Sequence, residues 1–338
     1  MWLLNTTTLE LRDFVGAEIP PYAILSHTWG EDEVTFKDML KYRETARQKA
    51  GFLKVEKCCE KARQDGLQHA WIDTCCIDKR SSAELSEVIN TMYRWYKDAK
   101  VCYAYLSDAR SEEMLSDAPK YDSLVESTWF TRGWTLQELI APTYIQFLGQ
   151  DWRVIGIKAS NWLSQTLLID QRFFSPSKND AFLSKVAEIS GVEETVLRYP
   201  HTVQLCPAAR KMAWAANRET KREEDLAYAL RGLFNVSMPI LYGEGLTKAF
   251  RRLQLEIIRM TTDQSIFVWR ASRESSGLLA ACPKDFSDSK LDFVWRRPTL
   301  QPYSMTNLGL LVNLPLIKSP DGRGFIAALR CCKSTQFM

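Results

Sequence analysis

The sequence predicts an α/β fold for the first half of the chain, with a parallel sheet and helices on both faces. Up to about residue 150, short apolar runs of strand length alternate with longer segments of helical period. Each of the first three runs ends in polar residues, as strands do where ligands bind at the edge of an open parallel sheet. These two observations predict the fold class, and they place the candidate functional residues at the ends of the strands.

The elements follow one another in a regular order. Strands are predicted at residues 22–26, 69–74, 101–106 and 144–148. Helices are expected between them at residues 36–40, 52–64, 81–99 and 134–140. The clearest is 81–99, where apolar residues recur every three or four positions and Ser81 with Glu84 has the spacing of a capping box. The acidic stretch 109–124 is predicted to be an exposed loop.

The pattern changes after the fourth strand. Residues 153–265 show helical periodicity without convincing strands, and apolar strand-like runs return at 266–269, 308–312 and 325–329. We therefore expect three parts: an α/β domain over 1–152, a helical region over 153–265, and a β-rich module over 266–338 that this chain leaves incomplete.

Charge and cysteine content exclude several function classes. With 44 basic and 41 acidic side chains the net charge is +3, and no long basic run occurs, so nucleic acid is not an expected partner. Nine cysteines, three times in adjacent pairs and never as Cys-x-x-Cys, predict reduced thiols and no zinc site. The N-terminus lacks a signal peptide and no stretch of about 18 apolar residues occurs, which indicates a cytosolic protein without a membrane span.

Polar residues at the predicted strand ends are the candidate binding residues. They are Ser26, His27, Trp29 and Asp32 after the first strand, Asp73 and Asp78 after the second, and Ser107 after the third, with Trp134 in the following helix. Each has a purely structural alternative. Tryptophans are more often core residues, aspartates often cap turns or helices, and a single histidine after a strand is more often a hydrogen-bonding residue than a base.

Glu138 is the candidate catalytic residue, because its carboxylate lies among apolar neighbours. Leu136, Leu139 and Ile140 accompany it in a short predicted helix, and burying a carboxylate without a purpose is costly. The alternative is a Glu138 that faces solvent. The chain contains no dinucleotide or Walker fingerprint, no Gly-x-Ser-x-Gly, no His-Glu-x-x-His and no metal-ligand spacing, so no cofactor or metal is expected.

Three sequence blocks resemble a known family. Residues 22–30 (YAILSHTWG), 71–78 (WIDTCCID) and 130–139 (FTRGWTLQEL) are similar to the signature blocks of the fungal heterokaryon-incompatibility (HET) domain. Downstream, residues 212–215, 222–228 and 238–245 resemble the continuation found in many filamentous-fungal HET proteins. One departure is Lys79-Arg80, where many members carry Gln after the second block.

The resemblance implies a role in cell death after fusion of incompatible hyphae. It also implies a distant kinship with Toll/interleukin-1 receptor (TIR) domains, hence a flavodoxin-like sheet. Residues 134–139 are similar to the Trp-Cys-x-x-Glu-Leu of plant TIR domains, with Thr135 in place of Cys. Because enzymatic TIR domains cleave NAD with that glutamate, the resemblance assigns Glu138 the same role.

Two functions are left open. In the first, the chain is an NAD glycohydrolase: nicotinamide leaves as a neutral molecule, so one carboxylate suffices, with Ser26 and His27 binding ribose or phosphate and Trp29 or Trp134 stacking on a ring. In the second, it is a non-enzymatic signalling module that self-associates or recruits other death-signalling proteins. Helix 81–99 would then be the contact surface, through Glu84, Glu87, Arg94 and Lys97.

Overall fold

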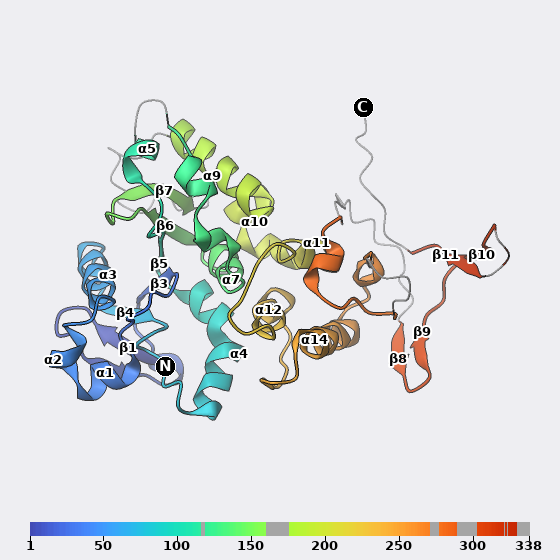
Figure 1. Cartoon of the computed structure of the whole chain (residues 1–338), viewed down its shortest axis with the longest axis horizontal. Helices are drawn as coiled ribbons and strands as arrows, with labels where there is room; N and C mark the ends of the chain where they lie inside the picture. Colours follow the sequence, from blue (N-terminus) through green and yellow to red (C-terminus); the bar gives the residue numbers. More distant parts are fainter. Residues whose placement is uncertain are drawn as a thin grey trace. The chain divides into compact units, whose positions relative to one another are not determined.

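The computed structural model describes residues 1–115, 119–159, 176–270, 277–288, 303–320, 322 and 324–329. The chain divides into two compact units, Met1–Val203 and Gln204–Met338. The first unit is built on a seven-stranded sheet with flanking helices, whereas the second is mainly helical and ends in two short hairpins (Figure 1). The α/β fold predicted for the first half of the chain is confirmed.

The four predicted strands form the parallel centre of the sheet. They are β3 (Ala23–His27), β4 (His69–Ile72), β5 (Val101–Tyr105) and β6 (Tyr144–Leu148), side by side in the order β4-β3-β5-β6. The chain therefore goes from β3 to its neighbour on one side and then returns to its neighbour on the other. Such a reversal is the topological switch point at which open α/β sheets bind ligands, outside the carboxyl ends of the strands.

Three further strands extend the sheet at its edges, and all three pair antiparallel. β1 (Trp2–Asn5) and β2 (Leu11–Asp13) come from residues before 22, where no strand was expected, and β7 (Val154–Ala159) comes from the region expected to lack strands. Those two expectations are wrong. Strands of three or four residues are too short to show an alternating pattern. β7 contains Lys158, and a lysine is rarely buried, so its sequence does not look like a buried strand.

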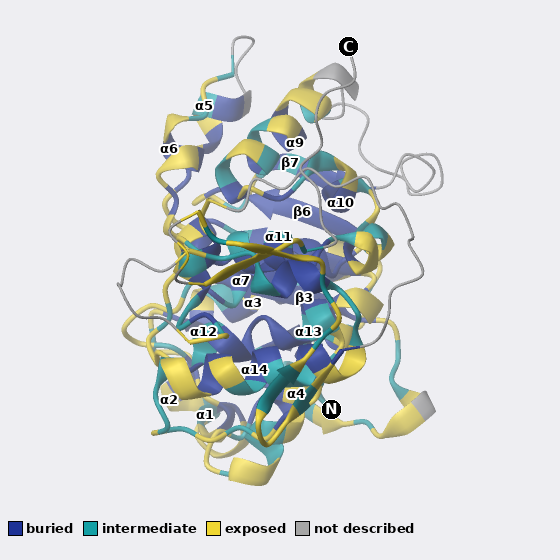
Figure 2. Cartoon of the chain, turned by 90° about the vertical axis from the view of Figure 1, so that its right-hand side faces the viewer, coloured by how far each residue is buried: buried dark blue, intermediate teal, exposed yellow. Residues whose placement is uncertain are grey.

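Two long helices of this unit lie where helices were predicted. α3 (Phe52–Gln64) and α4 (Ser82–Asp98) each bury one apolar stripe, and Figure 2 shows the strands of the sheet among the buried residues. α7 (Thr135–Ile140) is buried at all six positions. A helix buried all round is fixed in place by its neighbours, so α7 is a rigid support for Glu138.

The start of α4 forms only half of the predicted capping box. The Ser81 hydroxyl oxygen accepts the Glu84 amide at 3.2 Å. The Glu84 carboxylate, however, accepts the amide of Asp78 at 3.0 Å, three residues before the N-cap position. The glutamate thus ties the preceding turn to the helix.

Short helices connect these elements: η1 (Gly16–Glu18), α1 (Phe36–Lys41), α2 (Arg43–Ala46), α5 (Ser111–Leu115), α6 (Asp122–Val125) and η2 (Thr128–Thr131). The exposed loop predicted at 109–124 is wrong for its described part, because α5 and α6 lie there. Met114 and Leu124 are buried and hold these two helices against the unit. Residues 116–118 of that stretch lie outside the described residues.

Two helices complete the first unit beyond β7. α9 (Pro176–Ser190) contacts β7, and α10 (Glu194–Arg198) contacts both β7 and α7. Gly156 makes the close approach of α9 feasible, since a Cβ atom there would lie 2.2 Å from the ring of Phe182. The 3₁₀ helix η3 (Pro200–Leu205) follows.

The second unit contains α11 (Ala208–Ala213), α12 (Asp225–Tyr228), α13 (Arg231–Phe234), α14 (Leu246–Met260), η4 (Gln264–Phe267) and η5 (Pro283–Phe286). The strand predicted at 266–269 is wrong, because the Asp263 carboxylate accepts the Ser265 amide at 2.9 Å and starts η4 instead. The other two predicted strands are confirmed in shortened form.

Two hairpins carry those strands. β8 (Ser304–Thr306) pairs with β9 (Gly309–Leu311), and β10 (Leu316–Lys318) pairs with β11 (Phe325–Ala327), both antiparallel. Their apolar side chains are largely exposed. These hairpins form the described part of the C-terminal β module.

The described cysteines form no disulfide bond. Seven cysteines lie among the described residues, all as free thiols; Cys58, Cys59, Cys75, Cys76 and Cys102 are buried, and Cys206 and Cys282 are half-buried. Cys331 and Cys332 lie outside the described residues. Across the described ranges, no helix has the length and apolar character needed to cross a bilayer.

Candidate functional site

The polar residues at the end of β3 point to opposite faces of the sheet. Ile24 lies beside Trp71 of β4, whose ring packs on α4, so Ser26, two residues on, faces the α4 side. Leu25 lies beside Tyr103 of β5, whose hydroxyl reaches the end of α3. His27 therefore faces α3. The candidate site consists of two clusters, one on each side of the same strand end.

The first cluster is a chain of hydrogen bonds through Ser26. The indole N–H of Trp129 donates to Ser26 Oγ at 2.8 Å, and the Ser26 hydroxyl donates to Glu138 Oε2 at 2.5 Å. Trp129 is 1% exposed, Ser26 fully buried and Glu138 8% exposed. The predicted burial of Glu138 is confirmed. Because Ser26 accepts from the indole, its one proton is directed at the carboxyl group.

Burial controls the ionisation of Glu138. It raises the pKa of Glu138 to about 8, and hydrogen bonds with Ser26 and Tyr96 oppose that shift without cancelling it. The negative charge of Asp73 acts in the same direction as burial. In the free protein at neutral pH the group is therefore mainly a neutral carboxylic acid. A cation placed beside it would favour the carboxylate.

Two contacts hold α7 in place at its ends. Thr135, its first residue, donates its hydroxyl to the carbonyl oxygens of Trp129 (2.5 Å) and Arg132 (2.9 Å). At the other end the buried ammonium of Lys158, from β7, donates to the carbonyl oxygens of Leu139 (2.6 Å), Ile140 (3.0 Å) and Pro142 (2.7 Å). A cation is favourable at a helix C-terminus, where these carbonyls have no helical partner. Burial nevertheless lowers the pKa of Lys158 to about 7.

The second cluster surrounds His27 with carboxylates but gives it no hydrogen bond. Nδ1 lies 3.8 Å from Asp73 Oδ1 and Nε2 lies 3.9 Å from Glu33 Oε1, on opposite sides of the ring. Both ring nitrogens and Asp73 Oδ1 are buried without a hydrogen-bond partner. Burial lowers the pKa of His27 below its usual 6.5, so the ring is neutral at pH 7. Lys54 forms an ion pair with Glu33 on the α3 side.

Trp29 connects the second cluster to the surface. It is 39% exposed, and its indole N–H donates to Asp73 Oδ2 at 2.7 Å. The Lys79 ammonium lies 3.5 Å from the centre of the Trp29 ring. A cation at this distance from an indole face is attracted by the ring electrons. The departure from the family pattern at Lys79 therefore has a definite contact, on the face of a predicted binding residue.

The remaining predicted residues lie away from both clusters or serve local structure. Asp32 accepts the Ala50 amide at 3.1 Å, and Asp78 accepts hydrogen bonds from the Arg80 side chain. Ser107 is exposed after β5 and Trp134 is half-buried at the start of α7. Asp108, next to Ser107, accepts the Thr128 amide at 2.9 Å.

Four residues of the site are absent from the predicted set. They are Trp129 and Tyr96 in the first cluster and Glu33 and Lys54 in the second. Tyr96 follows the apolar face of α4 and donates to the Leu25 carbonyl oxygen at 3.1 Å, so its sequence signal is that of a core residue. Trp129 lies immediately before the third signature block, which starts at Phe130, and that position was its only sequence signal.

Neither a metal nor a phosphate loop is apparent in the described ranges. There, no group of three or more His, Cys, Asp or Glu side chains is arranged to hold a metal ion. The Tyr242–Gly245 turn, which superficially resembles a phosphate loop, donates its Gly243 and Gly245 amides to the Glu224 carboxylate at 2.7 and 3.2 Å. The chain's own anion thus occupies the place where a phosphate would bind.

Comparison with known proteins identifies the family. Residues 22–123 match the family described as heterokaryon incompatibility protein (HET), a range that includes Ser26 and His27 and ends before Glu138, and residues 248–307 match a domain of unknown function (DUF8212). The chain is 41% identical over 250 residues to the vegetative incompatibility protein HET-E-1 of Podospora anserina. This alignment covers 73% of the chain and 17% of that much longer relative. No solved structure matches the chain. The chain thus belongs to the heterokaryon-incompatibility (HET) domain proteins.

Proposed function

We propose that this chain is a cytosolic cell-death effector in heterokaryon incompatibility, and that it cleaves NAD at the nicotinamide–ribose bond through Glu138. The incompatibility role is supported by the HET family match and by the printed name of the similar Podospora anserina protein. The observation that carries the enzymatic part is the buried Glu138 carboxyl group, hydrogen bonded to Ser26 at the carboxyl end of β3. The strand order β4-β3-β5-β6 supports a TIR-like, flavodoxin-like arrangement.

The proposed chemistry uses the ionisation of Glu138. In the free protein its raised pKa keeps the group neutral at pH 7. NAD carries a positive charge on its nicotinamide ring, and that charge placed beside Glu138 favours loss of the proton. The resulting carboxylate stabilises the positive charge that develops on the ribose as nicotinamide leaves. Water then completes the hydrolysis.

The second cluster supplies the binding groups in this proposal. Trp29 is exposed enough to offer a ring for stacking, and Lys79 beside it supplies a cation for the pyrophosphate. Asp73 connects the two clusters, because it holds the Trp29 indole and its charge raises the pKa of Glu138. His27 faces α3 with Nδ1 beside Asp73 Oδ1, so we assign it to the support of Asp73.

NAD turnover by the purified full chain tests the enzymatic proposal. We expect nicotinamide release by protein that has been deliberately clustered and a loss of at least about 100-fold in kcat for Glu138→Gln. We expect normal rates for Glu126→Gln, at an exposed glutamate after α6. We also expect kcat/KM to rise between pH 6 and about 8, since the carboxylate is the active form. Clustered wild-type protein that leaves NAD intact would exclude the enzymatic proposal, as would an active Glu138→Gln.

A non-enzymatic signalling module is the second candidate function. The observation that favours it is the hydrogen bond that the buried Glu138 carboxyl group accepts from Ser26 in the free protein, because a structural residue requires such a partner as well. In this case the chain self-associates or recruits other death-signalling proteins without consuming NAD. Cell death that persists in Glu138→Gln but fails when self-association is removed would favour this second function over the first.

A further inference from the structure

Arg231, the first residue of α13 in the second unit, is a buried arginine without a partner. It is 2% exposed, and its Nε and Nη1 atoms are both buried without a hydrogen bond. Across the residues that the structure describes, the side chain also forms no ion pair. Its third nitrogen, Nη2, is equally unpartnered there but is not a buried atom. The guanidinium therefore reaches the surface at Nη2 alone.

Burial does not remove the charge of this side chain. It lowers the pKa of Arg231 to about 10, and the positive charge of Arg252 acts in the same direction, whereas Tyr228 opposes the shift. A group with this pKa is still protonated at neutral pH. An unpaired buried charge is unfavourable, because it has lost its hydration without gaining a counter-ion. Arg231 therefore lacks a negatively charged partner.

The charged neighbours of Arg231 do not supply that partner. Arg252 is already bound to Glu244, whose two carboxylate oxygens accept from its Nε, at 3.0 Å, and its Nη2. The Tyr228 hydroxyl also donates to Glu244, at 2.9 Å. When Arg231, Arg252 and Glu244 are counted together, two positive charges are matched by one negative charge. One further negative charge balances the group.

The two carboxylates just before Tyr228 in the sequence are engaged in local structure. Glu224 accepts the amides of Gly243 and Gly245 at 2.7 and 3.2 Å. Asp225 accepts the Tyr242 hydroxyl at 2.9 Å. Neither of these carboxylates contributes to the shift in the pKa of Arg231. The negative charge that Arg231 lacks therefore has to come from a bound group.

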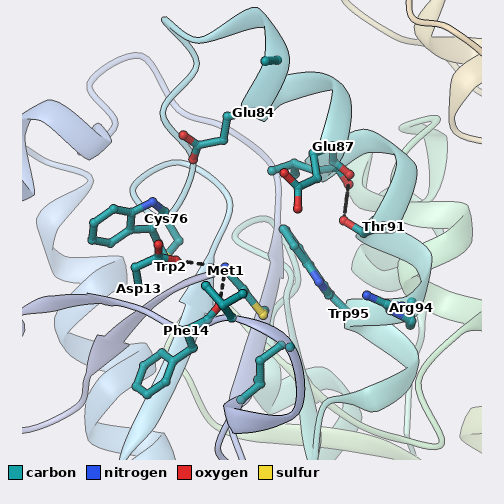
Figure 3. Close-up of a pocket in the computed structure, with 15 residues that line it drawn as sticks. Met1, Trp2, Asp13, Phe14, Cys76, Glu84, Glu87, Thr91, Arg94 and Trp95 are labelled. Atoms are coloured by element: carbon teal, nitrogen blue, oxygen red, sulfur yellow. Dashed lines mark hydrogen bonds and ion pairs between the residues drawn. The ribbon is translucent and has the colours of Figure 1, made fainter.

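Charges in the first unit show the usual arrangement by contrast. A pocket of about 470 Å³ beside α4 is lined by several charged groups (Figure 3). The Met1 ammonium there donates to Asp13 Oδ1 at 3.1 Å, and Glu87 and Arg94 are exposed. Each of these charges is either paired or hydrated. Arg231 is neither paired nor exposed, which sets it apart from the charges of that pocket.

We propose that the second unit binds an oxyanion at Arg231, namely the carboxylate or phosphate group of a small molecule. Such a group offers at least two oxygens, which match two neighbouring N–H groups of a guanidinium. Nη2 belongs to both edges of that fork, so it takes part whichever edge is used. Because Nε and Nη1 are buried in the free protein, binding requires a local opening beside α13.

This inference goes beyond the proposed function and does not depend on NAD cleavage. Every group in it belongs to Gln204–Met338, whereas Glu138 and its partners belong to Met1–Val203. A chain that leaves NAD intact can still bind an anion at Arg231. A chain that binds no anion can still cleave NAD.

Titration of the full chain with sodium acetate and, separately, with inorganic phosphate tests the proposal, at an ionic strength held constant with sodium chloride. NMR spectroscopy follows the side-chain N–H resonances of the arginines, and the resonance missing from Arg231→Met identifies Arg231. We expect this resonance to shift to saturation with at least one of the two anions. The anion that saturates it at the lower concentration identifies the chemical class of the ligand.

Thermal denaturation of the same protein provides a second measurement. We expect a saturating anion to raise the Tm of the wild type by about 2 to 4 °C and to leave that of Arg231→Met unchanged. In chloride alone, Arg231→Met is expected to melt no lower than the wild type, because it removes an unpaired buried charge. Arg251→Met, at an exposed position of α14, is the matched control and should keep the full response.

Three outcomes overturn the proposal. The first is an Arg231 resonance that neither anion shifts to saturation. The second is an equal rise in Tm for the wild type and Arg231→Met, which places the anion elsewhere. The third is an Arg231→Met variant that melts well below the wild type in chloride, which shows that Arg231 has a partner in the free protein.

Discussion

Ser26 and His27 are neighbours at the end of β3, yet their surroundings are opposite in kind. Ser26 stands in a complete chain of hydrogen bonds between Trp129 and Glu138, and none of these three side chains has a buried polar atom without a partner. His27 is flanked by two carboxylates at 3.8 and 3.9 Å, and both of its ring nitrogens lack a hydrogen bond. One peptide bond separates a satisfied cluster from an unsatisfied one.

The difference shows which cluster is fixed and which is free to respond. Each satisfied buried hydrogen bond restrains its partners, so the Ser26 cluster holds Glu138 in a single orientation. Unsatisfied buried polar atoms are costly, and small movements that bring a partner within hydrogen-bond distance remove that cost. In the proposed enzyme, the face toward α7 therefore carries the reacting group and the face toward α3 adapts to what binds. Four measurements test this contrast.

The largest effect is expected from the pH dependence of Glu138→Gln. The native pKa of Glu138, about 8, lies above its unfolded value, so the wild type loses stability as pH rises from about 4.5 to 8. Glutamine has no such penalty. We expect the free energy of unfolding of the variant to gain about 3 kcal/mol on the wild type between pH 5 and pH 8, by urea denaturation. A gain that is equal at both pH values would contradict the raised pKa, and Glu126→Gln is the control.

Ser26→Ala should break the satisfied cluster directly. The substitution removes a hydrogen bond from Trp129 and one to Glu138, and leaves both buried groups without that partner. We expect a loss of about 2 kcal/mol in the free energy of unfolding at pH 7, measured in the same way. Ser107→Ala, at an exposed site, should change stability by less than about 0.5 kcal/mol. Equal effects of the two substitutions would mean that the cluster contributes nothing.

His27→Leu should behave in the opposite sense. It removes two unsatisfied nitrogens, so we expect no loss at pH 7 and a gain of up to about 1 kcal/mol. The native pKa of His27 is lowered, so the wild type loses stability as pH falls below about 6.5, and the advantage of leucine should grow from pH 7 to pH 5. A loss above about 1 kcal/mol at pH 7 would show that His27 has partners in solution.

The smallest effect is expected from Lys79→Met. Its contact with the Trp29 ring is partly exposed, so we expect a loss of about 0.5 kcal/mol in stability. The charge of Lys79 lowers the pKa of His27, so its removal should raise that pKa. Histidine proton resonances report this shift readily, because the sequence contains only three histidines. An unchanged His27 pKa would separate Lys79 from the cluster.

The sequence was sufficient for the central strands and for the burial of Glu138. Alternating segments predicted β3, β4, β5 and β6, and the apolar neighbours of Glu138 predicted its position inside. The short edge strands β1 and β2 were missed because three or four residues carry no period. Placing Ser26 and Glu138 at one sheet edge followed from strand ends and topology.

The hydrogen-bond and charge partners within each cluster could not be predicted from the sequence. Ser26 and Trp129 are 103 positions apart, and which residue of a strand end faces which helix depends on the register of the whole sheet. In the sequence Trp129 cannot be distinguished from an ordinary core tryptophan. Only the structure shows that its indole N–H donates to Ser26. Glu33 and Lys54 read as ordinary charged residues for the same reason, since their contact with each other comes from the docking of α3.

Lys158 makes the stability of the site helix accessible to chemical footprinting. Its amine is fully buried against the last carbonyl groups of α7, so an acylating reagent reaches it only when β7 separates from that helix. The rate of its acylation, read by mass spectrometry, would therefore report how often the support of Glu138 opens. Exposed lysines of the same chain, such as Lys97, provide the reference rate in the same sample.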